Sequence, residues 1–433
     1  MAKQKRKTDR LVIEEWLDSV YMFRRNTVNN MIEYTDDKNT PYKFITEFEF
    51  NNIIRKIEIE KEYNVSKNDL LTILNSNFTP EYHPIRNYFK QLTNRYTWEY
   101  ERLEDIKELE IYRLADTLTL QESNHKDVNI HTIFCEFLRN WMTASVANSM
   151  TDYECQNQMC LVLIGEEGLR KSSWLMNLVP QALKDYGKTS KIDLHRIDIW
   201  LDLGRIFLYN IDDQLRNLQR KDSETMKTII TQPHDFKRLP HAVFNTFIPR
   251  ICNFCGSING REFLADTGKN RRYFPFEVLN INYELLSSID IDKCWFEAYM
   301  LFVNGVKYWY DTSELAKFDT NSYRVIKPEE ELFYEFFDPV LDEKNIPPNA
   351  QYKTPMQILR QLEGFTKQRL SIKVLGEFLT HIKCVKKAKN INGRVEKPYV
   401  VVEKYIDLYE QQSLLTAKPV SLPNTLPPAK INF

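Results

Sequence analysis

A glycine-containing segment at residues 165–172 has the composition of a phosphate-binding loop. It reads Gly-Glu-Glu-Gly-Leu-Arg-Lys-Ser, follows an apolar run and precedes a helical pattern. The usual pattern is G-x-x-x-x-G-K-[ST], and Arg170 takes the place of the second glycine. Loop amides and a helix N-terminus bind phosphates, the lysine adds positive charge, and the hydroxyl ligates Mg²⁺. We therefore predict nucleotide binding by Gly165, Glu166, Glu167, Gly168, Leu169, Arg170, Lys171, Ser172 and Ser173.

Two acids end the next apolar run. Residues 206–211 are followed directly by Asp212 and Asp213. Such a pair can hold Mg²⁺ and orient or deprotonate an attacking water. We predict that Lys171 and both acids are catalytic and that Ser172 and Asp212 hold the metal; a strand ending in a solvated turn is the alternative.

Further polar residues follow later runs. Asn259 comes after a third apolar segment, where its amide can contact a γ-phosphate or the lytic water. Arg271 and Arg272 precede the apolar run 273–276, a placement that suits an arginine finger donated to a neighbouring subunit. One of these two arginines is expected to be only a surface residue.

A basic turn lies between the second and third runs. It contains Lys237, Arg238 and His241, which we predict to contact DNA phosphates or to act as a sensor. The alternative is that these charges serve only solubility, as in many exposed turns.

The elements that must position these residues form an α/β pattern. Residues 159–164, 205–210 and 250–255 are continuous apolar runs typical of strands buried on both faces, and helical segments separate them. Residues 131–150 carry a helical apolar stripe. The predicted fold class is an α/β P-loop NTPase core.

The flanking regions differ from this core. Helical spacing before residue 120 predicts a mainly helical N-terminal region. Two helices and a hairpin around residues 392–393 are typical of a winged helix, and residues 367–397 hold nine Lys or Arg and two acids, a net of +7. The expected divisions are 1–125, 126–310, 327–410 and an extended tail at 411–433.

Composition limits the possible classes of protein. With 433 residues, 42% hydrophobic and 27% charged, the chain is neither disordered nor fibrous. Its net charge of -1 requires local patches for any nucleic-acid affinity. The absence of a long apolar run and the seven cysteines predict a soluble cytoplasmic protein without a membrane partner. Cys252 and Cys255 form a lone CxxC, for which strand packing is favoured over metal binding.

Taken in order, these segments resemble the virulence-associated protein E family, which is related to superfamily 3 helicases within the AAA+ class. The matching stretches are HPIRNYFKQL, LVLIGEEGLRKSSWL, FLYNIDDQ, HDFKRLPHAVF, RICNFCGSING and EFLADTGKNRRYFPFEV, within residues 80–285. The resemblance implies that Lys171 and Ser172 bind phosphate and Mg²⁺, that Asp212 and Asp213 are Walker B acids, and that Asn259 is sensor 1. It also implies an arginine-finger region at Arg271 and Arg272.

The resemblance implies a function in mobile genetic elements such as prophages, islands and conjugative elements. We expect a DNA translocase or helicase that uses ATP and Mg²⁺ and works as a homo-oligomeric, hexameric ring on single- or double-stranded DNA. Any priming is expected to be done by a separate primase. Two alternatives stay open at this point. One is a nucleotide-dependent defence or regulatory switch, and the other is a DNA-binding replication initiator with a degenerate P-loop.

Overall fold

The computed structural model describes most of the chain. The described residues are 2–62, 64–100, 108–122, 129–194, 199–212, 215, 220–238, 244–260, 263–264, 271–318, 323, 326–391 and 394–404. The chain divides into two compact units, Met1–Arg324 and Val325–Phe433. Among the described helices, none is both long and apolar enough to cross a membrane. The expected tail at 411–433 lies outside the described residues.

The first unit begins with a small mixed lobe. Its elements are α1 (Ala2–Val20), β1 (Met22–Asn26), β2 (Met31–Thr35), β3 (Lys43–Phe44), α2 (Glu47–Lys61), α3 (Lys67–Leu74) and β4 (Glu81–Tyr82). The strands form a sheet in the order β3-β2-β1-β4. The expectation of a mainly helical region missed this sheet, because its strands are short and Phe23 and Tyr34 pack among helical residues in one shared core.

A large sheet forms the centre of the unit. Within the described residues, its strand order is β5-β12-β6-β11-β8-β7. All neighbours pair in parallel except β5, which pairs antiparallel with β12. The strands are β5 (Leu118–Leu120), β6 (Cys160–Ile164), β7 (Gly187–Thr189), β8 (Leu208–Asp212), β11 (Asn253–Ile258) and β12 (Tyr273–Ile281).

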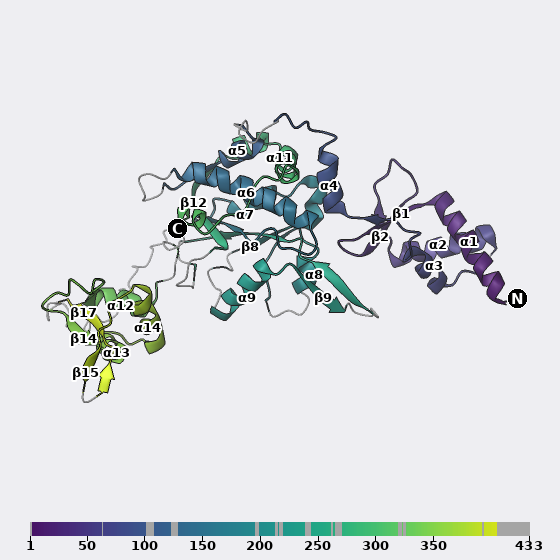
Figure 1. Cartoon of the computed structure of the whole chain (residues 1–433). Coiled ribbons are helices and arrows are strands. Elements are labelled where there is room, and N and C mark those ends of the chain that lie inside the picture. The colour runs from purple at the N-terminus through teal and green to yellow at the C-terminus, as the bar shows by residue number, and fades with distance from the viewer. Residues whose placement is uncertain are drawn as a thin grey trace, which may run out of the picture. The chain divides into compact units, whose positions relative to one another are not determined.

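Alternate residues of these strands face two helical layers, which is why the runs are continuously apolar. Leu161 and Leu163 of β6 lie in one apolar cluster with the helices α4 (Pro84–Leu92), α6 (Ile130–Met150), α7 (Lys171–Asn177) and α11 (Ile291–Val303). Cys160 and Val162 lie in a second cluster with α8 (Ile199–Leu203) and α9 (Arg220–Thr231). Figure 1 shows the two sets of helices on opposite faces of the sheet. The result is a mixed α/β architecture of three layers.

The remaining elements of this unit are the helices and short strands outside the large sheet. They are α4 (Pro84–Leu92), α5 (Glu110–Ala115), α6 (Ile130–Met150), α7 (Lys171–Asn177), η2 (Gln181–Tyr186), α8 (Ile199–Leu203), α9 (Arg220–Thr231), β9 (His234–Arg238), β10 (Asn245–Pro249), α10 (Tyr283–Ser288), α11 (Ile291–Val303) and η4 (Glu314–Lys317). Because β5 joins the large sheet and α4 and α5 pack in its core, residues 84–100 and 108–120 belong structurally with the core and not with the N-terminal lobe.

The second unit has its own apolar core. Its elements are α12 (Pro328–Phe336), β13 (Phe337–Pro339), β14 (Gln351–Lys353), α13 (Pro355–Glu363), α14 (Ile372–His381), β15 (Lys389–Ile391), β16 (Arg394–Glu396) and β17 (Tyr399–Glu403). Thr354 and Gln357 form a capping box on α13, and Ser371 caps α14. Both helices therefore begin where the sequence signals predict. The hairpin β15–β16 is also present.

Candidate functional site

The loop from 165 to 170 joins β6 to α7. A Cβ atom added at Gly165 would lie 2.6 Å from the Val278 carbonyl oxygen, so only glycine fits at the start of the loop. Gly168 has a φ of 91°, a left-handed value that favours glycine. The two glycines of the motif are thus required by backbone geometry at this turn.

Arg170 occupies the left-handed region as well, with φ 57° and ψ 36°. A non-glycine residue there costs about 1–2 kcal/mol. The Tyr283 hydroxyl donates a hydrogen bond of 2.8 Å to the Arg170 carbonyl oxygen, and the guanidinium lies 5.8 Å from the Tyr283 ring centroid. Arg170 therefore adopts the conformation that the usual glycine would supply, and Tyr283 supports it.

Lys171 is the first residue of α7 and is 5% exposed. Its ammonium donates hydrogen bonds to the carbonyl oxygens of Gly165 at 2.9 Å and Glu166 at 2.8 Å, and to Oδ1 of Asn259 at 3.0 Å. The lysine thus connects the loop to the end of β11, and two predicted site residues, Lys171 and Asn259, are in direct contact.

Three oxygen-bearing side chains meet beside this lysine. Ser172 Oγ donates to Asp212 Oδ1 at 2.9 Å and lies 2.8 Å from Ser257 Oγ, which itself donates to Asp212 Oδ1 at 2.6 Å. Hydroxyl and carboxylate oxygens are the ligands that Mg²⁺ prefers. Ser257 was missed as a site residue because a serine inside an apolar run carries no signal of its own.

The parallel sheet explains why these residues meet. Ser257 of β11 stands opposite Asp212 of β8, and Ile258 stands opposite Ile164 of β6. The carboxyl ends of β6, β8 and β11 therefore lie together at one end of the sheet, which we call the carboxyl edge. Gly165, Asp212 and Asn259 stand at these strand ends. Ligands of open parallel sheets bind outside this edge.

Asn210 is a second residue that sequence patterns did not indicate. It is fully buried on β8, on the same face as Asp212, and neither side-chain polar atom has a hydrogen-bond partner within the described part of the chain. An unpaired buried amide is costly and is often matched by water or a ligand. Asn210 therefore places a second polar side chain on this face of β8, two residues before Asp212.

Arg271 and Arg272 lie at the opposite end of the strands, where β6 and β12 begin. Arg272 immediately precedes β12, and its carbonyl oxygen accepts a hydrogen bond from the backbone amide of Cys160, the first residue of β6. The five residues of β6 separate this point from the loop, a span of about 16 Å. Arg271 is exposed and Arg272 is partly buried, and the structure does not bring either one to the loop of its own chain.

Lys237 and Arg238 belong to the hairpin β9–β10. Lys237 Nζ lies 3.3 Å from Asp235 Oδ2, and Arg238 is exposed. His241 and Asp213 lie outside the described residues. The hairpin is a structure separate from the loop cluster.

One face of this hairpin is aromatic, which sequence analysis did not anticipate. Phe247 lies 5.3 Å from Phe236, 5.0 Å from His234 and 5.0 Å from Tyr153 between ring centroids. Phe236 is 58% exposed and Tyr153 is 72% exposed. The sequence did contain a signal for this face: aromatic rings stand at positions 234 and 236, and alternate residues of a strand lie on the same face.

Comparisons with known proteins give a family and a set of structural neighbours. The profile of the virulence-associated protein E-like domain matches residues 89–325, more than half of the chain. No curated protein matches the sequence. One apo structure of the NrS-1 C-terminal region is 14% identical, with a TM-score of 0.46, and the match covers 91% of this chain and 99% of that one. A second NrS-1 C-terminal structure, the A form, is 12% identical with a TM-score of 0.45, covering 90% of this chain and 98% of that chain.

The profile match spans the sheet, the 165–172 loop and the serine–aspartate cluster. The resemblance seen in the sequence motifs and the match of the family profile overlap over residues 89–285. The chain belongs to the virulence-associated protein E-like family.

Proposed function

We propose that the protein is an ATP-dependent DNA translocase or helicase with an AAA+-type P-loop core, acting in replication of a mobile genetic element. The observation that carries the proposal is the contact of Ser172 with Asp212 beside the buried Lys171. A binding site for a nucleoside triphosphate with Mg²⁺ requires these side chains, and they stand at the carboxyl edge of a parallel sheet.

The loop supports binding of the phosphates. Its glycines let the backbone turn closely over the end of β6, and the N-terminus of α7 favours negative charge. The Lys171 ammonium is already held between two carbonyl oxygens and the Asn259 amide. A phosphate oxygen would compete for the same ammonium without a large movement of the lysine.

The serine–aspartate cluster supports the proposed metal site. Ser172 Oγ and the Asp212 carboxylate would hold Mg²⁺, and Ser257 keeps the carboxylate oriented through its hydrogen bond. The ion would neutralise charge on the transferred phosphoryl group. We assign to Asp213 the orientation or deprotonation of the attacking water, and to Asn259 a contact with the γ-phosphate.

The position of the arginines supports a ring with nucleotide sites between subunits. About 16 Å of strand lies between Arg272 and the loop of the same chain, which exceeds the reach of an arginine side chain. Arg271 or Arg272 would therefore serve the loop of the next subunit, which requires a homo-oligomer, and we propose a hexamer.

The hairpin supports contact with DNA. Its exposed rings offer stacking surfaces to bases, and Arg238 lies on the same face as Phe236 by strand alternation, with Lys237 on the other face. Lys237, Arg238 and His241 would contact phosphates without reading sequence. The basic C-terminal unit is proposed as a winged-helix-like auxiliary DNA contact, and priming as the work of a separate primase.

Hydrolysis of ATP by the purified protein, with and without single-stranded DNA, tests the proposal. DNA-stimulated turnover is expected in the natural protein and in Lys184→Ala, which removes an exposed lysine, and is expected to be lost in Lys171→Ala. Absence of turnover in the natural protein under every condition would contradict it and favour the initiator alternative. Nucleotide-driven assembly without strand separation would favour the switch alternative.

The salt dependence of DNA binding is the second test. If Lys237 and Arg238 contact phosphates, the logarithm of affinity should fall linearly with the logarithm of salt concentration. The double variant Lys237→Gln/Arg238→Gln should reduce the slope by about 2. An unchanged slope would remove the hairpin from the DNA interface.

A further inference from the structure

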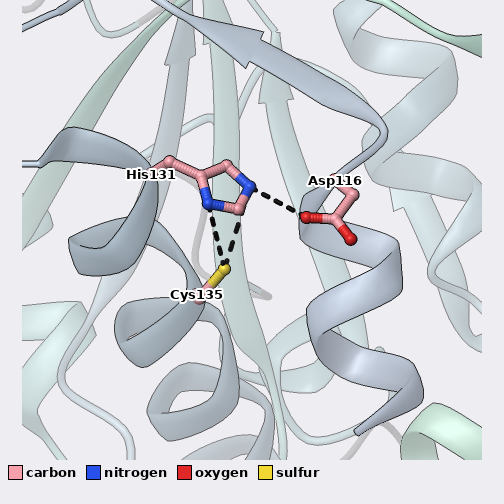
Figure 2. A group of neighbouring side chains, drawn as sticks. All are labelled: Asp116, His131 and Cys135. Carbon is pink, nitrogen blue, oxygen red and sulfur yellow. Dashed lines mark hydrogen bonds and ion pairs between the residues drawn. The ribbon is translucent and has the colours of Figure 1, made fainter. Parts of the chain in front are cut away.

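Three side chains from two helices meet at a point that the proposed function does not use. Asp116 directly follows α5, and His131 and Cys135 lie on α6. Their potential ligand atoms all lie within 4.8 Å of one another. Figure 2 shows the imidazole of His131 between the carboxylate of Asp116 and the sulfur of Cys135.

The helices fix this arrangement. His131 and Cys135 are four residues apart, so they lie on the same face of α6, one turn above the other. Asp116 is the C-terminal cap of α5. The backbone amide of Asp116 donates hydrogen bonds to the carbonyl oxygens of Tyr112 and Leu114. Thr117, the next residue, accepts a hydrogen bond of 2.8 Å from the Trp174 indole. Backbone and side-chain bonds therefore hold both sides of the cluster.

The distances are close to those of a tetrahedral metal site. His131 Nε2 lies 3.0 Å from Asp116 Oδ1 and 3.9 Å from Cys135 Sγ, and all three potential ligand atoms lie within 4.8 Å of one another. Bonds of about 2.0–2.3 Å to zinc in a tetrahedron place ligand atoms about 3.3–3.7 Å apart. A small shift of the side chains would thus bring one nitrogen, one oxygen and one sulfur to a common ion.

The ligand types select the class of ion. Thiolate and imidazole ligands suit Zn²⁺ and related transition metals, whereas Mg²⁺ and Ca²⁺ prefer oxygen alone. A nucleophilic cysteine–histidine pair is the competing interpretation, and the metal titration described below distinguishes the two.

We propose that Asp116, His131 and Cys135 bind one divalent transition-metal ion of the Zn²⁺ class, with a water molecule as the fourth ligand. The ion would join the end of α5 to the beginning of α6. This site is distinct from the Ser172–Asp212 cluster and does not depend on nucleotide binding.

Titration of the metal-free, full-length protein with Co²⁺ tests the site. We expect one equivalent to bind with a sulfur-to-cobalt charge-transfer absorption and a tetrahedral visible spectrum. Cys135→Ser should abolish the charge-transfer absorption, and His131→Gln and Asp116→Asn should weaken binding by at least about 10-fold. Cys155→Ser, a control at another partly exposed cysteine, should leave the spectrum unchanged.

Thermal unfolding with Zn²⁺ provides a readout that does not depend on colour. A ligand that binds only the folded protein raises the melting temperature, so Zn²⁺ should raise it in the natural protein and in Cys155→Ser but not in His131→Gln. The proposal is overturned if Co²⁺ binds without the charge-transfer absorption, if Cys135→Ser retains that absorption, or if Zn²⁺ stabilises His131→Gln as much as the natural protein. In that event the three residues form only an ion pair and a neighbouring thiol.

Discussion

The carboxyl edge of the large sheet and the β9–β10 hairpin carry polar and charged residues in opposite ways. At the edge, Ser172, Asp212 and Ser257 are joined by hydrogen bonds, and Lys171, which is 5% exposed, donates one to Asn259. On the hairpin, Phe236 is 58% exposed and Arg238 faces solvent. The first region is organised before any ligand binds, which suits chemistry, and the second offers surface, which suits contact with a long polymer.

This difference teaches that the two proposed activities are separable. A change at the edge should affect turnover of ATP and leave DNA affinity alone, and a change on the hairpin should do the reverse. The following substitutions test that separation, beginning with the largest effect.

Asp212→Asn should have the largest effect. It removes the charge of the carboxylate that accepts hydrogen bonds from Ser172 and Ser257 while keeping the shape of the side chain. We expect ATP turnover to fall by about 100-fold or more and DNA affinity without nucleotide to stay within about twofold. Steady-state hydrolysis and fluorescence anisotropy measure the two quantities, and a parallel loss of both would show that the regions are not separable.

Phe236→Ala should produce the reverse pattern. Loss of one stacking ring costs about 1–3 kcal/mol per base, so single-stranded DNA affinity should fall by about 5- to 150-fold. Turnover without DNA should not change. The matched control is Phe48→Ala on α2, another ring that is 75% exposed; equal losses in both variants would make the effect nonspecific.

Ser257→Ala should have a smaller effect at the edge. It deletes one hydrogen bond of 2.6 Å to Asp212 but leaves Ser172 in place. One such bond is worth about 0.5–1.5 kcal/mol, so turnover should fall by about 2- to 10-fold. The Mg²⁺ concentration for half-maximal activity should rise as well. A loss as large as that of Asp212→Asn would show that Ser257 is itself a metal ligand.

Substitutions at Arg170 should have the smallest effect. The residue has a left-handed φ of 57°, which glycine adopts freely and a β-branched residue does not. Arg170→Gly should keep turnover within about fivefold and the free energy of unfolding within about 1 kcal/mol of the natural values, whereas Arg170→Val should be less stable than the natural protein, because a β-branched residue fits the left-handed region worse than arginine does. Thermal denaturation compares the two. Equal stability of both variants would mean that the loop does not hold this conformation.

Much of the site could be predicted from sequence because it depends on local order. The buried runs ending at Ile164 and Asp212 are recognisable by their apolar continuity, and the glycines and the Lys-Ser pair of residues 165–172 mark the strand-to-helix turn. The helices capped by Thr354 and Ser371 were equally accessible, since their caps are short-range patterns. The alternation of strand and helix therefore determined the mixed α/β architecture.

The tertiary structure decided what depends on pairing between distant segments. Only the parallel register sets Ser257 against Asp212, and only the shared sheet shows that Arg272 and the loop lie at opposite edges. The pairing of β5 with β12 places residues 84–100 and 108–120 with the core, and the meeting of Asp116 with His131 and Cys135 depends on how α5 packs on α6. These contacts join residues far apart in the chain, and sequence periodicity carries no information about which strand or helix will be the neighbour.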